Sequence, residues 1–138
     1  ALGFCSFMKL AGKGGHLFPK LRQEYQCRCI QVSERNRKQV EFLLQGKIID
    51  TPGHTADSIS LLLRDGSLFC GDAAMNGLPS LHRITIWVED KTAFLKSWET
   101  IIAFRPKIIY PGHGKPFEYG ELIANMNRAK NMKLLPLS

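Results

Sequence analysis

The chain is 138 residues long, which is typical of one domain, and we expect residues 1–138 to form a single domain. Hydrophobic residues make up 44% and charged residues 22%, a composition that excludes a disordered chain and allows a packed core. No apolar run approaches the roughly 20 residues that span a bilayer, so we predict no membrane segment.

The net charge of +7 comes from 19 basic and 12 acidic residues and would suit an anionic substrate or a nucleic acid. The basic residues are dispersed along the chain, however, and no basic motif is interleaved with aromatic residues. The charge alone therefore does not favour a nucleic-acid partner, and the partner we expect is a small-molecule substrate.

Four cysteines indicate the redox setting. Cys27 and Cys29 would lie on the same side of a strand, where a disulfide between them is awkward. A single Cys-x-Cys is also a weak metal signal. Cys70 ends an apolar strand and is expected to be a small buried residue, and Cys5 is the fourth cysteine. The first residues lack the features of a signal peptide. These observations favour reduced thiols and a cytoplasmic location.

The first half of the chain is predicted to be mostly strand. Residues 1–11 could form a short helix, and the Asp-Gly pair within 64–66 is typical of a hairpin turn. Runs rich in β-branched and other apolar residues predict the strands. They are residues 25–32, 39–44, 47–50, 58–63 and 67–70.

The second half shows helical periodicity. An amphipathic helix is predicted over 90–104, with Asp90 as its N-cap. A short buried strand at 107–110 and a tight loop at 111–116 follow, and then a helix over 118–133. Its inward face is expected to carry Leu122, Ile123, Met126 and Ala129.

Three loops each present one ligand-type side chain directly after an apolar strand. These are His54 in "TPGH", Asp72 in "GD" and His113 in "PGHG". Each residue alone is more often a surface histidine or a turn-forming aspartate. The same arrangement of strand, glycine and ligand occurs three times, which indicates a shared site. Histidine with carboxylate suits zinc, manganese or iron.

The segments "TPGHTADS", "GDA" and "PGHGKP", in this order, resemble the metallo-β-lactamase superfamily of metal-dependent hydrolases. The resemblance runs from about Tyr25 to Arg128. It implies an α/β (α+β) fold, the αβ/βα sandwich, with the site along one edge of its two sheets. Of that sandwich we expect the C-terminal part only, a mixed sheet with flanking helices.

The resemblance also implies roles. His54 would bind one metal, His113 the other, and Asp72, the catalytic residue, would bridge two divalent ions, zinc above all. A metal-bound hydroxide would attack an ester, thioester, lactam or related bond.

The chain departs from the family pattern in one respect. It contains no His-x-His-x-Asp-His segment, and His16 is the only histidine before His54. Each metal would keep one histidine and a share of Asp72, fewer than the three protein ligands of a catalytic zinc. Three explanations stay open. The chain is the C-terminal portion of a longer enzyme, or it is a metal-free relative with a binding role, or another chain completes its metal site. We expect this chain by itself to be inactive, and we expect its metal sites to be empty or only partly occupied.

Two further alternatives stay open. His82 follows the Asp72 loop and is a weak candidate for substrate binding, although a surface histidine is the commoner case. A metal-dependent nuclease fits the charge but has no supporting motif, and a non-catalytic interaction module would keep the fold without its chemistry.

The strand at 58–63 predicts a sheet that is covered on both faces. Ile59, Leu61 and Leu63 alternate with Leu62, so both faces are apolar. If half of a sandwich is missing, one face is left open. We therefore expect a homodimer or an association with the missing N-terminal half.

Overall fold

A computed structural model describes residues 32–131, 133 and 135–136 of the chain. These lie in one compact unit, Val32–Ser138. The helix predicted at 1–11 and all but the last residue of the strand predicted at 25–32 lie outside the described residues, as do Cys5, His16, Cys27 and Cys29. A single domain over residues 1–138 stays a prediction.

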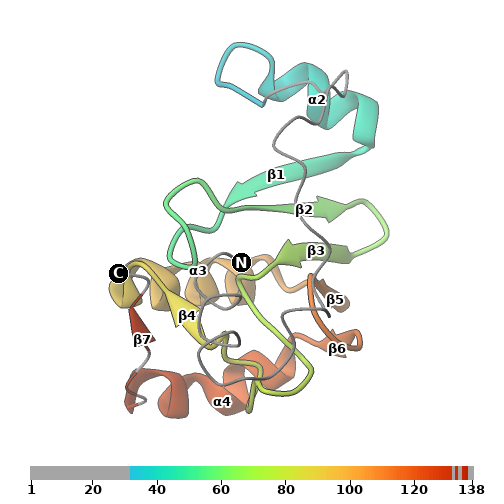
Figure 1. The fold of residues 1–138 in the computed structure, drawn as a ribbon. Helices are drawn as coiled ribbons and strands as arrows, with labels where there is room; N and C mark the ends of the chain where they lie inside the picture. The colour runs from blue at the N-terminus through green and yellow to red at the C-terminus, as the bar shows by residue number, and fades with distance from the viewer. Residues whose placement is uncertain (1–31, 132, 134, 137–138) are drawn as a thin grey trace, which may run out of the picture. The chain divides into compact units, whose positions relative to one another are not determined.

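The main sheet has five strands in the order β1-β2-β3-β5-β6. Strand β3 is antiparallel to β2 and parallel to β5, and β2 is antiparallel to β1. Strands β1, β3 and β5 therefore run the same way and end at the same edge of the sheet (Figure 1). The strands are β1 (Gly46–Asp50), β2 (Ile59–Leu63), β3 (Ser67–Gly71), β5 (Ile108–Pro111) and β6 (Phe117–Glu118).

The hairpin between β2 and β3 forms where the sequence predicts it. Gly66 adopts a φ of 94°, a left-handed conformation that favours glycine, and its N–H donates to the carbonyl of Leu63. Strands β4 (Trp87–Val88) and β7 (Leu135–Pro136) form a separate parallel pair that the sequence analysis missed.

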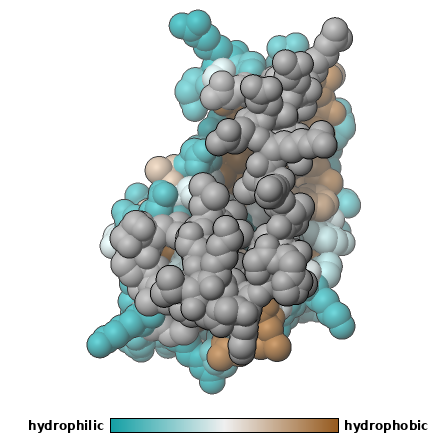
Figure 2. Space-filling model, in the orientation of Figure 1, coloured by the Kyte–Doolittle hydropathy of each residue, from teal (hydrophilic) through white to brown (hydrophobic). Residues whose placement is uncertain are grey.

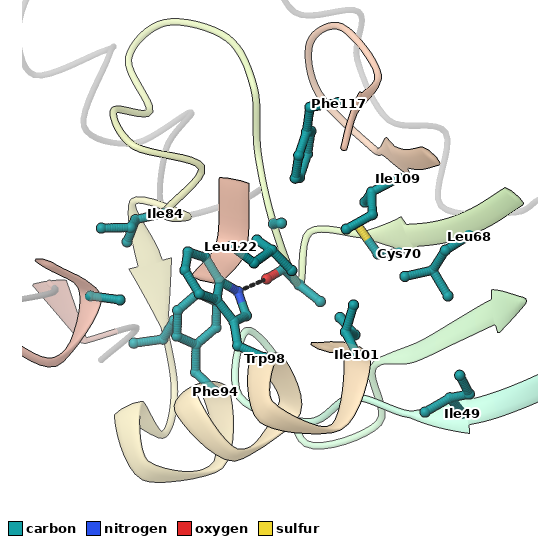
Figure 3. Packing of buried hydrophobic residues seen from close by; sticks show 14 residues of the cluster. Ile49, Leu68, Cys70, Ile84, Phe94, Trp98, Ile101, Ile109, Phe117 and Leu122 are labelled. Atoms are coloured by element: carbon teal, nitrogen blue, oxygen red, sulfur yellow. Dashed lines mark hydrogen bonds between the residues drawn. The ribbon is translucent and has the colours of Figure 1, made fainter. Parts of the chain in front are cut away.

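Two helices, α3 (Lys91–Phe104) and α4 (Gly120–Asn131), contact each other and cover one face of the sheet. Asp90 caps α3 as predicted, since its side chain accepts from the N–H groups of Thr92 and Ala93. The core residues Phe94, Trp98 and Ile101 come from α3 (Figure 3). The predicted mixed sheet with flanking helices is thus confirmed.

Trp98 connects this core to the edge where the candidate ligands lie. Its indole is fully buried, and its Nε1–H donates to the carbonyl of Ala73 at 2.7 Å (Figure 3). Ala73 follows Asp72 directly, so the packing of α3 fixes the backbone that carries this carboxylate. Burial of so large a side chain is a major source of stability.

The strand predicted at 39–44 is wrong, because these residues belong to helix α2 (Arg37–Leu44). Short apolar runs do not distinguish a strand from a helix by pattern alone. Most residues of α2 are good helix formers, and the helix places Arg37 and Glu41 one turn apart on the side of β1. Arg37 donates to the carbonyl of Ile48, and Glu41 accepts from the N–H of Ile48. Helix α2 thus engages the N–H and C=O groups of Ile48 on the outer edge of β1.

The last helix differs from its prediction in detail. It begins at Gly120 rather than at 118, because Phe117 and Glu118 pair with β5. Leu122 and Ala129 are buried as expected, but Ile123 is 52% exposed. Among the described residues, no helix is long and apolar enough to cross a membrane.

The face of the sheet opposite α3 and α4 is also apolar. The strand register aligns Ile48, Leu61, Phe69 and Tyr110 in one row across it, and the rings of Phe69 and Tyr110 stack at 5.0 Å. Phe69 is 45% exposed, and Ile59 is 43% exposed. Hydrophobic surface is visible along the right-hand side of Figure 2, at the height of α2 and the sheet.

Candidate metal centre

The three ligand-type side chains lie at one edge of the main sheet because each follows a strand that ends there. His54 follows β1, Asp72 follows β3 and His113 follows β5. Asp72 Oδ2 lies 3.6 Å from Nε2 of His54 and 3.7 Å from Nε2 of His113. The structure therefore brings together the residues that the repeated pattern had singled out.

The loop that carries His54 is fixed to the rest of the fold. Gly53 has a φ of 135°, and a Cβ there would lie 2.4 Å from the backbone of Phe94, so only glycine fits. Behind it, the buried hydroxyls of Thr51 and Ser60 share a hydrogen bond of 2.8 Å. Ser97 on α3 donates to the carbonyl of Pro52 at 2.6 Å.

The imidazole of His54 has a defined orientation. Its Nδ1 lies 2.8 Å from the carbonyl oxygen of Trp87. A carbonyl can only accept, so Nδ1 carries a hydrogen, and in the neutral ring the lone pair is then on Nε2. That lone pair is on the side of Asp72, which is the arrangement of a metal-binding histidine with a carbonyl behind it.

The carboxylate of Asp72 is only partly satisfied. Oδ2 faces both histidines, whereas Oδ1 is buried and has no hydrogen-bond partner among the described residues. Gly112 lies against it, and a Cβ on Gly112 would stand 2.8 Å from Oδ1. A buried carboxylate oxygen without a partner carries a large desolvation cost unless a cation is near.

His113 is held mainly through its backbone. Its carbonyl accepts from the N–H of Asn76 at 2.9 Å, and Gly114 approaches Asn76 so closely that a Cβ would stand 1.9 Å from the Asn76 carbonyl oxygen. The His113 side chain is 66% exposed, whereas that of His54 is 19% exposed. The two histidines thus differ in how firmly the fold sets their rings.

These features fit a divalent cation. Ligand atoms that each bind one zinc ion at about 2.0–2.2 Å in tetrahedral geometry lie roughly 3.4 Å apart. The distances from Asp72 to each histidine are close to this value and beyond ordinary hydrogen-bond range. In the part of the chain that the structure describes, however, no three His, Cys, Asp or Glu side chains are arranged to hold one ion together. Asp72 pairs with each histidine separately, so residues 32–131 offer two protein ligands for each ion.

Cys70, two residues before Asp72, does not join the site. Its thiol is buried, and burial raises its pKa to about 12, with a smaller contribution from the negative charge of Asp72. Near neutral pH it is a protonated thiol, neither a nucleophile nor a metal ligand.

His82 lies elsewhere on the surface. It is exposed, and its Nδ1 accepts from Nη1 of Arg128 on α4 at 2.8 Å. Among the described residues it forms no hydrogen bond or ion pair with His54, Asp72 or His113. A role in substrate binding stays a prediction.

One contributor to the site was not predicted from the sequence. The carbonyl of Trp87 lies 33 residues from His54, and a backbone group carries no sequence signal. Gly112, in contrast, belongs to the repeated arrangement of strand, glycine and ligand, and the structure places it against the carboxylate of Asp72.

Two curated relatives resemble the chain in sequence. The Beta-lactamase-like protein 2 homolog of Drosophila melanogaster is 37% identical over 81 residues, which are 56% of this chain and 26% of that protein. The protein of the same name from Caenorhabditis elegans is 41% identical over 69 residues, 49% of this chain and 21% of that protein. The chain thus spans about a quarter of the length of these relatives. No family model matches it.

Solved structures share the fold. An archaeal metallo-beta-lactamase superfamily protein from Sulfolobus tokodaii has a TM-score of 0.54 at 21% identity, covering 67% of this chain and 36% of that one. A metallo-beta-lactamase from Erythrobacter litoralis, with beta-mercaptoethanol in its active site, has a TM-score of 0.54 at 19% identity. The match covers 77% of this chain and 50% of that one. The fold predicted from the sequence is confirmed, and it covers only part of each of these structures.

Proposed function

The chain resembles the metallo-β-lactamase superfamily in sequence and shares its fold, and from that premise we propose that it is part of a metal-dependent hydrolase. His54, Asp72 and His113 are its metal ligands in this proposal. The substrate is a small molecule with an ester, thioester, lactam or related bond. Because one fold serves many substrates, the fold does not choose among these bonds.

The main support for the proposal is the position of the Asp72 carboxylate. A single carboxylate oxygen of Asp72 faces the Nε2 atoms of both histidines, while its second oxygen is buried without a partner among the described residues. A structural aspartate would satisfy both oxygens with N–H donors or an arginine. A carboxylate set between two imidazole nitrogens is instead suited to contact two cations.

Divalent cations held there would lower the pKa of a bound water and polarise the bond to be hydrolysed. The residues of this chain have separate parts in that chemistry. Asp72 supplies negative charge to both cation positions, and His54 supplies a neutral nitrogen whose direction the Trp87 carbonyl sets. His113, with its exposed side chain, lies on the solvent side, where a substrate can approach.

The proposal places the remaining ligands outside the described residues. The curated relatives match this chain over 26% and 21% of their own length. We propose that the chain is the C-terminal portion of a longer enzyme and that a His-x-His-x-Asp-His segment precedes it in the parent protein. Reading the upstream coding sequence tests this, and a complete upstream sequence without such a segment would contradict it.

Activity is tested in the parent protein, by metal content and by hydrolysis of a generic thioester. Asp72→Ala is expected to remove most bound metal and to lower kcat/KM at least 100-fold, because one carboxylate serves both ions. Cys70→Ala and His82→Ala are the controls, since Cys70 packs in the core and His82 contacts α4. Equal losses in all three variants would contradict the assignment.

A further inference from the structure

The loop that carries His54 is attached to the segment before α3 on both sides of the histidine. Before it, the carbonyl of Gly53 accepts from the N–H groups of Glu89 at 2.8 Å and Asp90 at 3.1 Å. After it, the N–H of Ala56 donates to the Glu89 carboxylate at 2.9 Å. Glu89 therefore holds the loop twice, once by its backbone and once by its side chain.

The ring of His54 is held by the same segment. The carbonyl of Trp87, two residues before Glu89, accepts from Nδ1 of His54 at 2.8 Å. The ring reaches this carbonyl only while the loop stays against β4 and the start of α3. The Glu89 bond to Ala56 is one of the contacts between the loop and this segment, beside the backbone bonds to Gly53.

The two histidines of the site differ in this respect. Within residues 32–131, the ring of His113 lies within ion-pair distance of Asp72 alone, and its side chain is 66% exposed. His54 has both Asp72 and the Trp87 carbonyl, and its side chain is 19% exposed. The fold thus sets one ligand of the pair in advance and leaves the other to adjust.

We propose that Glu89 is a positioning residue for His54: its carboxylate holds the loop so that the Trp87 carbonyl keeps the imidazole in the Nδ1–H form, with Nε2 turned toward Asp72. The inference rests on the proposed role of His54 as a metal ligand. It adds a residue outside the ligand set, and it predicts that the orientation exists before any metal binds. Hydrogen-bond partners behind a ligand commonly change metal affinity by about 10–100-fold.

The experiment is long-range 1H–15N NMR of the His54 ring in the metal-free 138-residue chain at pH 8, followed by titration with zinc. In the chain without substitutions, Nδ1 is expected to be protonated and Nε2 unprotonated. This is the reverse of the tautomer that a free imidazole side chain favours in water. In Glu89→Ala, the ring is expected to shift toward the Nε2–H form, and zinc affinity is expected to fall about tenfold.

Two variants separate positioning from general damage. Glu89→Gln keeps an acceptor oxygen for Ala56 and is expected to restore most of the ring signature and of the zinc affinity. Glu99→Ala removes an exposed glutamate on α3 and is expected to leave both unchanged. An unchanged ring form in Glu89→Ala, with zinc affinity within twofold of the starting protein, would overturn the proposal. A ring that responds to Glu89→Ala but whose Nε2 resonance ignores zinc would retain the positioning and overturn the proposed function instead.

Discussion

Gly112 lies directly against the carboxylate of Asp72, and a Cβ at position 112 would stand 2.8 Å from Oδ1. The N–H of Gly112 also donates to the carbonyl of Gly71 at 2.7 Å, so the loops after β3 and β5 are joined beside the carboxylate. The glycine is therefore needed for the space that Asp72 occupies, and the ends of two parallel strands form one site.

Gly112→Ala is expected to displace the Asp72 carboxylate, because the end of a side chain moves more easily than the backbone. Zinc affinity should fall at least tenfold, while the free energy of unfolding changes by about 1 kcal/mol or less. Calorimetric zinc titration and urea unfolding measure the two effects. Gly120→Ala is the control, since nothing lies within 4 Å of a Cβ there. Unchanged zinc affinity in Gly112→Ala would show that this contact does not matter to the site.

Gly53→Ala is expected to destabilise the whole fold. The φ of 135° is nearly restricted to glycine, and the new Cβ would lie 2.4 Å from the backbone of Phe94, which cannot yield as a side chain can. Strain and overlap together should lower the free energy of unfolding by more than about 3 kcal/mol.

Gly71→Ala is the matched control for this effect. Its φ of 53° is also left-handed, but nothing lies within 4 Å of a Cβ, so only the backbone term of about 1–2 kcal/mol applies. Urea unfolding of both variants makes the comparison. Equal losses of stability would mean that the contact with Phe94 adds nothing.

Cys70 is expected to resist alkylation in the native state. Burial raises its thiol pKa from 9.0 to about 12, so the folded protein keeps the proton at pH values where the unfolded chain has lost it. The contribution of the Cys70 thiol to the free energy of unfolding is therefore complete below pH 9, and it is lost as the pH rises toward 12. Iodoacetamide at pH 9 should modify Cys70 in urea but not in buffer, as mass spectrometry of the Cys70 peptide would show. Rapid native modification would contradict the burial.

The apolar face of the sheet opposite α3 and α4 predicts self-association of the isolated chain. Phe69 and Ile59 leave apolar surface on the face opposite α3 and α4. Light scattering of the 138-residue chain should show a dimer or larger species at micromolar concentration, and Phe69→Lys should shift it toward the monomer. Lys38→Ala, an exposed position on α2, is the control. A monomer across a wide concentration range would contradict the expectation.

The sequence predicts the three candidate ligands better than it predicts the groups that support them, and the reason is physical. Apolar strands, glycine and a ligand follow each other within a few residues, so local pattern places His54, Asp72 and His113 at strand ends. The supports of these ligands are not local. The Trp87 carbonyl is a backbone group on a two-residue strand, and such short strands carry no periodicity.

Helix α2 is a failure of a different kind. Residues 39–44 form a short apolar run that suggests a strand by pattern, although Arg, Lys, Gln, Glu and Leu, which make up most of Arg37–Leu44, are good helix formers. Arg37 and Glu41, one helical turn apart, also contact the backbone of Ile48. Ile123 has a helical position that favours burial, yet its side chain is 52% exposed.

Anomalous diffraction at the zinc edge, from crystals of the chain soaked in zinc, tests directly whether Asp72 and the two histidines bind metal. We predict an anomalous peak, of full or partial occupancy, about 2.0–2.2 Å from an Asp72 carboxylate oxygen and from Nε2 of His54 or His113. Zinc bound only at other residues, with the His54 and His113 rings turned away from Asp72, would contradict it.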